Sequence, residues 1–267
     1  MEDQKRRQVE YHEKQHYRAA RPRAIDNSHL YVEWLNNYRL RKVLEMMRRP
    51  LSGKTVLSVC GGDGQEADFF QQLGAKVTVV DLSTVALEAA RLRNPALQCI
   101  CMDAESLTFA DRSFDWVIVR DGLHHLARPI KGFYELERVS REGFGILEGQ
   151  DSLPVRVLSK LGIAENWDPA GGYVYRFNRR EIHKIFSSLQ TVRDWKIHTA
   201  WLPFGSDILG LFPPFKRFVY PIMNQQMIYK LLATKPARSA FKTMFQLMIS
   251  ITGRWGNSLI IVAHMKE

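Results

Sequence analysis

The residues best suited to chemistry begin with a glycine-rich loop after a short apolar run. The run Val56-Leu57-Ser58-Val59 leads directly into Cys60-Gly61-Gly62-Asp63-Gly64. Glycines between a buried strand and a helix let the backbone approach a ligand closely, with the helix N-terminus behind it. Asp81 and Asp103 end the next two apolar runs, and a carboxylate at the first of them can accept both hydroxyls of a ribose. The spacing predicts a nucleotide-type ligand, although a tight turn without a ligand would use the same glycines.

A second group follows the apolar run 114–119, in the order Arg120-Asp121-Gly122-Leu123-His124-His125. A histidine that titrates near neutrality can take a proton from a reacting hydroxyl, so His125 and His124 are the candidate catalytic residues. Asp121 and His124 are the candidates for holding a polar group of the substrate. Structural roles stay open, because one histidine could bond the local backbone and Asp121 could close the turn with Gly122.

Alternating apolar runs and helical stretches would position both groups. Apolar runs at 54–59, 76–80, 97–102, 114–119 and 144–148 predict five strands, separated by helices at 65–73, 84–93 and 130–140. A capped helix at 178–189 and strands at 191–201 and 257–264 complete the pattern. We therefore predict an α/β fold with a doubly wound, seven-stranded, mostly parallel sheet and right-handed crossovers.

The chain divides into four parts on this pattern. We predict an N-terminal helical lid at 1–50, a core at 51–202, a helical cap for the substrate at 203–256 and the last core strand at 257–267. The predicted cap has five prolines, at positions 203, 213, 214, 221 and 236, and two apolar stripes at helical spacing. The stripes could line a lipophilic acceptor pocket or simply pack on the sheet and on each other.

These motifs resemble the class I S-adenosylmethionine-dependent methyltransferases, in the ubiquinone/menaquinone-biosynthesis-like branch. The likeness covers about residues 50–150. Gly62 and Gly64 match the family motif V-L-D-x-G-x-G-x-G, in which Cys60 replaces a glycine and Ser58 the acid. Phe114-Asp115-Trp116-Val117-Ile118-Val119 and Glu137-Arg138-Val139-Ser140-Arg141-Glu142-Gly143 resemble the later motifs of the same family.

The resemblance implies a Rossmann-like core that binds S-adenosylmethionine and moves its methyl group to an oxygen or carbon of a small molecule. Asp81 would bind the ribose with Leu82 beside the adenine, and Asp103 with Ala104 would bind the adenine amino group. Arg120 would meet the carboxylate of the cofactor. The N-terminal helices would close the site, with Tyr17 touching cofactor or substrate. The implied cofactor-binding set is Cys60, Gly61, Gly62, Gly64, Asp81, Leu82, Asp103, Ala104, Arg120 and Tyr17.

Other function classes fit the sequence less well. A dehydrogenase fingerprint is missing, because Ala67 stands where G-x-G-x-x-G requires its last glycine. No base-flipping methyltransferase motif is found, so no nucleic acid partner is expected. Because Ser58 and Cys60 depart from the family motif, an alternative function stays open. The chain could be a cofactor-binding protein without methyl transfer, either a partner subunit or a cyclase. Two adjacent histidines cannot share one ion from a regular element, so no metal is expected.

Composition and charge suggest where the chain works. The formal net charge is +10, with an acidic centre between basic flanks. Three cysteines without C-x-x-C spacing suit a reducing compartment, and no secretory signal or spanning apolar run is found, so a cytoplasmic location is expected. Segment 203–256 carries seven Lys/Arg and one acid, which predicts peripheral contact with an anionic membrane. The oligomeric state is left open.

Overall fold

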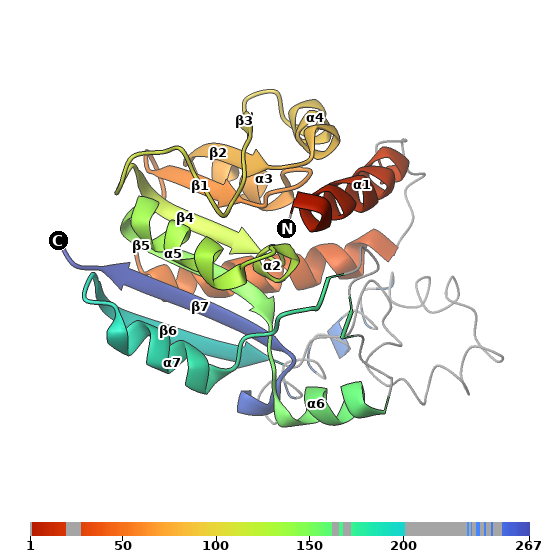
Figure 1. Ribbon diagram of the computed structural model, residues 1–267, viewed down its shortest axis with the longest axis vertical. Helices are drawn as coiled ribbons and strands as arrows, with labels where there is room; N and C mark the ends of the chain where they lie inside the picture. The colour runs from red at the N-terminus through yellow and green to blue at the C-terminus, as the bar shows by residue number, and fades with distance from the viewer. Residues whose placement is uncertain are drawn as a thin grey trace.

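One seven-stranded sheet with helices on both faces forms the centre of the computed structural model (Figure 1). The structure describes residues 2–19, 28–161, 166–167, 172–200 and 253–267, and only 234, 236, 239, 240, 243 and 247 between 201 and 252. The strand order is β3-β2-β1-β4-β5-β7-β6, and only β7 runs against its neighbours. The strands are β1 Thr55–Val59, β2 Lys76–Asp81, β3 Gln98–Cys101, β4 Phe114–Arg120, β5 Ser140–Gly149, β6 Val192–Ala200 and β7 Ser258–Met265.

Helices join these strands and have recognisable start signals. They are α1 Glu2–Ala19, α2 Ser28–Met47, α3 Gln65–Gln72, α4 Thr84–Arg93, α5 Pro129–Val139, α6 Leu153–Lys160 and α7 Arg179–Ser188, with short 3₁₀ turns at Leu123–His125 and Gly253–Trp255. The Ser83 hydroxyl accepts from the backbone N–H of Ala86 at the start of α4. Asn178 and Glu181 form a reciprocal capping box at the start of α7. These caps fix the residues at which α4 and α7 begin.

The sheet separates two apolar cores, because successive side chains of a strand point to opposite faces. Leu57 of β1 packs with the α5 and α7 side chains Phe133 and Phe186 on one face. Val56 of β1 packs with α2 and α3 on the other face, where Phe70 is fully buried. Burial on both faces explains why the central strands are almost continuously apolar.

The predicted fold class is confirmed, including all seven strands. The predicted boundaries agree within one residue except at β5, which begins at Ser140 instead of residue 144, directly after α5 ends at Val139. The polar stretch at 140–143 pairs with β4 across a register shift, and Arg141 there donates to Asp115 at 2.6 Å. Helix α6 had no counterpart in the prediction. Most of the cap expected at 203–256 lies outside the described residues, so that part remains a prediction.

Candidate functional site

A cavity of about 190 Å³ lies at the carboxyl ends of β1, β2 and β4, where parallel strands of this kind present their loops. Seven of the residues singled out in the sequence line it: Cys60, Gly62, Asp81, Leu82, Ala104, Asp121 and His125. Helix α1 contributes Lys5, Gln8 and Val9 from the other side. The structure thus brings the glycine loop, the first acid and one histidine to a single cavity.

Steric crowding requires glycine at one position of the glycine loop and at one position of the turn after β4. A Cβ on Gly61 would lie 2.6 Å from Ser58 Oγ and 2.7 Å from Val79 Cγ1. A Cβ on Gly122 would lie only 2.4 Å from the Cβ of Cys60. Cys60 itself has φ 52°, a conformation that glycine adopts more easily than any other residue. The loop therefore keeps its tight turn although a cysteine replaces a glycine of the family motif.

Asp81 ends β2 with its carboxylate turned into this loop. Its Oδ2 accepts from the N–H of Gly62 at 2.9 Å, and its Oδ1 accepts from the N–H of Ser83 at 2.9 Å. Each carboxylate oxygen keeps a further lone pair, and Asp81 lines the cavity. A fixed carboxylate beside Leu82 fits the hydroxyls and the base of an adenosyl group, so the residues present suit the expected cofactor.

A buried acid lies beneath the loop, although the acid of the family motif is replaced by Ser58. Glu66 of α3 is 1% exposed, accepts from Ser58 Oγ at 2.8 Å and pairs with Arg120 at 2.9 Å. Burial raises the pKa of Glu66, and Arg120 and Ser58 oppose that rise. Arg120, expected to meet the carboxylate of the cofactor, is held by Glu66 here. Its proposed contact with cofactor remains a prediction.

Asp121 follows β4 with φ 51° and forms a two-bond ion pair with α2. Arg39 donates to its two oxygens at 2.6 and 2.9 Å, and only 8% of Arg39 is exposed. Burial disfavours the charged form of Asp121, but Arg39 outweighs it and lowers the pKa of Asp121 to about 2. The Asp121 carboxylate is therefore charged at neutral pH and fixes the start of the histidine turn.

Glu148, the penultimate residue of β5, organises the two histidines. Its Oε1 accepts from the N–H groups of Gly122 and Leu123 at 2.9 and 2.7 Å, and its Oε2 lies 2.6 Å from His124 Nδ1. Because a carboxylate only accepts, the Nδ1–H of His124 donates to Glu148. The His125 ring lies 4.0 Å from that of His124 and lines the cavity. His124 is not among the residues that line the cavity, so its approach to an acceptor bound there stays a prediction.

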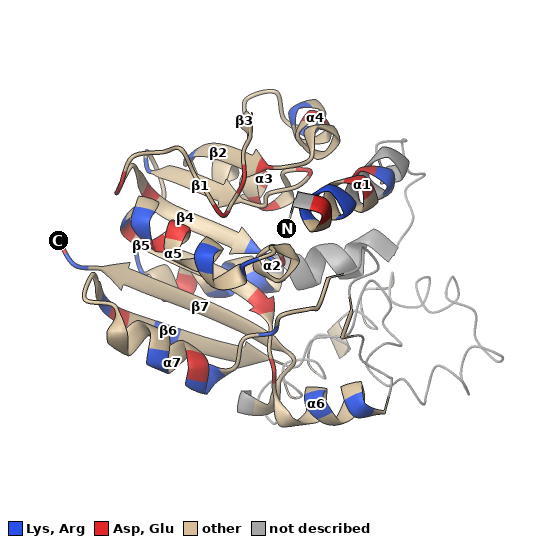
Figure 2. Cartoon of the chain, in the orientation of Figure 1, with Lys and Arg blue, Asp and Glu red and all other residues tan. Residues whose placement is uncertain are grey.

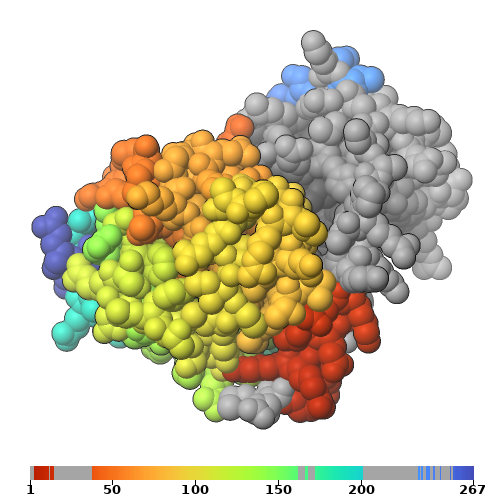
Figure 3. All heavy atoms as spheres, turned by 90° about the horizontal axis from the view of Figure 1, so that it is seen from above, coloured from red at the N-terminus to blue at the C-terminus, as the bar shows by residue number. Residues whose placement is uncertain are grey.

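Helix α1 is held over the cavity by Lys5. The Lys5 ammonium lies 2.5 Å from Asp103 Oδ2 and 3.1 Å from Glu105 Oε2. Figure 3 shows the N-terminal helix lying against the α4 region, which it contacts. That α1 closes the site as a lid stays a prediction. Tyr17 lies on α1, but its side chain is outside the described residues, so its contact stays a prediction.

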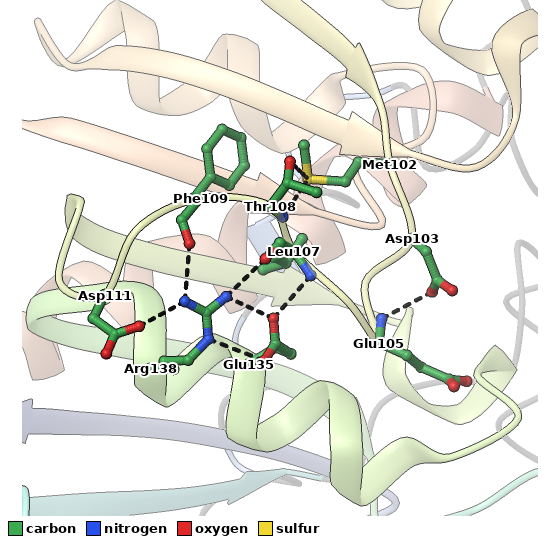
Figure 4. A network of polar contacts seen from close by, with 9 residues as sticks. All are labelled: Met102, Asp103, Glu105, Leu107, Thr108, Phe109, Asp111, Glu135 and Arg138. Carbon is green, nitrogen blue, oxygen red and sulfur yellow. Dashed lines mark hydrogen bonds and ion pairs between the residues drawn. The ribbon is translucent and has the colours of Figure 1, made fainter.

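The loop that carries Asp103 is fixed by one arginine of α5 (Figure 4). Arg138 donates to the carbonyls of Leu107 and Phe109 at 2.8 and 2.9 Å, and also to Asp111 and Glu135. The bond to Glu135 is the main cause of a raised pKa at Arg138. Asp103 Oδ1 accepts from the N–H of Glu105, which shapes the turn at the cavity wall. The second acid and Ala104 are positioned in this way.

Glu66, Glu148 and Lys5 are the site residues that the sequence did not reveal. Glu148 is the last residue of the apolar run 144–148, and that position at a strand end was the one available signal. Gly64 has φ 76° at the start of α3 and acts in the turn instead of lining the cavity. Within the described residues no cluster of three potential metal ligands occurs. In the same part of the chain, no helix is long and apolar enough to span a bilayer.

Known proteins resemble the part of the chain that carries this site. A family model described as "Methyltransferase domain" matches residues 57–147. Demethylmenaquinone methyltransferase from Renibacterium salmoninarum is 33% identical over 102 residues, 38% of this chain and 43% of the relative. The ubiquinone/menaquinone biosynthesis C-methyltransferase UbiE from Paracoccus denitrificans is 34% identical over 156 residues, 54% of this chain and 62% of the relative. The chain spans about half the length of these curated relatives.

Solved structures share the fold over a longer range. The YcgJ protein from Bacillus aligns over 86% of this chain and 99% of its own, with a TM-score of 0.58 and 21% identity. A Haemonchus contortus phosphoethanolamine N-methyltransferase in complex with S-adenosyl-L-methionine aligns over 86% of this chain and 53% of its own, with a TM-score of 0.55 and 17% identity. At these identities the likeness establishes the fold alone.

Proposed function

We propose that this chain, which carries a class I S-adenosylmethionine-dependent methyltransferase domain of the ubiquinone/menaquinone-biosynthesis type, transfers a methyl group to an oxygen or carbon of a small molecule. The observation that carries the proposal is the joint position of the Asp81 carboxylate and the histidine turn at one cavity. A nucleotide-binding wall and a proton acceptor at the same sheet edge would serve methyl transfer to a protic acceptor.

The cofactor would be held by the elements around the glycine loop. Asp81 would accept from the ribose hydroxyls, Leu82 would lie against the adenine, and the turn of Asp103 and Ala104 would face its amino group. The sulfonium of bound S-adenosylmethionine would supply an electrophilic methyl group. Lys5 fixes α1 beside Asp103, so this helix would restrict the access of water to the cavity.

The histidine turn would handle the proton of the acceptor. His124 Nε2 would receive the proton that leaves the acceptor oxygen or carbon, and the loss of that proton would make the acceptor atom nucleophilic. The resulting imidazolium would remain paired with Glu148, whose oxygen lies 2.6 Å from Nδ1. His125 would form the cavity wall next to it and orient the acceptor. Asp121 is already paired with Arg39. Its main role would therefore be to position the turn, and substrate binding would be secondary.

The acceptor is proposed to be lipophilic and related to quinone precursors. Two of the most similar relatives are named for ubiquinone or menaquinone chemistry. The apolar stripes in the sequence of 203–256 predict an apolar cap. A cytoplasmic location with peripheral contact to anionic membrane would suit such an acceptor. The proposal includes no nucleic acid substrate.

The direct test is release of S-adenosylhomocysteine during incubation with S-adenosylmethionine and a panel of demethylated quinols, phenols and aliphatic controls. We expect release only with an aromatic hydroxyl-bearing acceptor, and we expect isotope from the labelled methyl group in the product. Tight binding of the cofactor without turnover on any acceptor would instead assign the chain to the cofactor-binding proteins that do not transfer methyl groups.

A further inference from the structure

A second, larger cavity of about 1010 Å³ lies between α6, the segment 172–178 and α7. Five basic side chains line it: Arg156, Lys160, Arg176, Arg180 and Lys184. Figure 2 marks Lys and Arg positions along both α6 and α7. The methyl-transfer site uses none of these residues. We call this cavity with its basic residues the α6–α7 groove.

The two acids of the α6–α7 groove are already engaged by neighbouring groups. Asp151 accepts from Arg156 Nε and Nη2 at 3.0 and 2.8 Å. Glu181 accepts from the Tyr175 hydroxyl and from the N–H of Asn178 in the capping box. The remaining positive charge therefore faces the cavity, which suits an anionic ligand.

An exposed apolar stripe lies along α6, the helix that also contributes Arg156 and Lys160 to the groove. Leu153, Val157 and Leu161 follow each other at four-residue spacing and are 58%, 48% and 66% exposed. Val155, on the opposite side of α6, is buried and anchors the helix. Trp167 and Tyr173 form an isolated bridge nearby and are 65% and 57% exposed. Exposed aliphatic and aromatic side chains beside basic ones are typical of a helix that lies in a membrane interface.

We propose that α6 and the α6–α7 groove dock this protein on an anionic phospholipid bilayer. The basic residues would contact lipid phosphates, and the α6 stripe would enter the boundary between head groups and acyl chains. Aliphatic side chains at four-residue spacing give no advantage in binding nucleic acid, whose recognition uses charge and stacking. The inference is independent of the proposed methyl transfer.

The position of this surface relates it to the first cavity. Leu126 lines the first cavity, and Ile130, four residues later in the chain, lines the groove. Asp151 and Asp121 follow the neighbouring parallel strands β5 and β4 at the same edge of the sheet. Docking through α6 would therefore bring the edge that carries the first cavity towards the lipid.

The experiment is cosedimentation of the full chain with vesicles of phosphatidylcholine alone or with phosphatidylglycerol added. A charge variant carries Lys160→Gln, Arg180→Gln and Lys184→Gln. An apolar variant carries Leu153→Gln, Val157→Gln and Leu161→Gln. A matched control carries Arg49→Gln, Lys76→Gln and Arg193→Gln. It loses the same charge near the amino ends of the parallel strands, away from the groove. All variants retain segment 203–256, so its basic residues cannot explain a difference.

We expect the wild type and the control to bind anionic vesicles, and the charge and apolar variants to bind at least about tenfold more weakly. Far-ultraviolet circular dichroism and S-adenosylmethionine titration check that each variant is folded. Equal binding by all four proteins, or binding to neutral vesicles alone, would overturn the proposal. So would binding of a single-stranded oligonucleotide that only the charge variant loses, in the absence of vesicle binding. Since no turnover is measured, the outcome does not depend on methyl transfer.

Discussion

Glu148 makes three hydrogen bonds from a position that is 1% exposed, and all three go to the turn that carries the histidines. Two of them fix the backbone at Gly122 and Leu123, and the third sets which nitrogen of His124 carries the proton. A single buried carboxylate thus determines both the location and the tautomer of the proposed base. Burial of this carboxylate would be costly without these three partners.

Removal of the proposed base should slow turnover without loss of the cofactor. We expect His124→Ala to lower the rate of S-adenosylhomocysteine release by about a hundredfold. Glu148→Gln should lower it by about tenfold and change the pH dependence of the rate, because an amide cannot stabilise the imidazolium. His125→Ala should act mainly on the KM of the acceptor. If the activity of His124→Ala stays within a few fold of wild type, catalysis depends on alignment of the reactants and not on a base.

Arg39 and Asp121 connect two elements that are far apart in sequence. Helix α2 packs on the α3 face of the sheet, and its Arg39 reaches the turn after β4. Asp121 has a φ of 51°, and its ion pair helps hold the backbone in that conformation. The same turn leads to Gly122, where the Cβ of any other residue would clash with Cys60.

The pH dependence of unfolding tests this connection. The pKa of Asp121 is about 2 in the folded protein, below its ordinary value of 3.8, so its contribution to stability is complete above about pH 4 and is lost as the pH falls towards 2. We expect Asp121→Asn to lower the unfolding free energy by about 1 kcal/mol at pH 7, since solvent screens the half-exposed carboxylate. The difference from wild type should shrink as the pH falls from 5 to 2 in urea titrations. A constant difference would show that Asp121 acts only through the shape of the turn.

The elements differ in how well their sequence predicts them. The central strands were found because burial on both faces makes them continuous apolar runs, and α7 because Asn178 begins it with a capping box. Helix α6 is eight residues long, has proline in its first turn and exposes its apolar side, so it lacks the usual core-facing pattern. The early start of β5 depends on pairing with β4 across a register shift, which local sequence does not encode.

At the scale of the whole molecule, the acids that support the site depend on which elements lie together. In the sequence, Glu66 is an ordinary helical residue. It contacts Ser58 and Arg120 only because α3 packs under β1. In the sequence, Lys5 is one of many charged residues of α1. It lines the cavity only because that helix lies across it. Asp81, in contrast, was predictable because a strand end and a glycine loop define its position locally. The sequence pattern therefore identified several residues that line the cavity, and the tertiary structure was needed to identify the residues that support them.

Calorimetric titration with S-adenosylmethionine, comparing wild type with Asp81→Ala, is the most direct test of the central claim. We expect wild type to bind one equivalent and Asp81→Ala to bind about 30- to 100-fold more weakly, because charge-assisted bonds to two hydroxyls are lost. Asp63→Ala, at an acid of the same loop that pairs with Arg93, should bind within threefold of wild type. Thermal unfolding confirms that the variants are folded. Equal affinity in wild type and Asp81→Ala, or no binding by wild type, would contradict the assignment of this cavity to the cofactor.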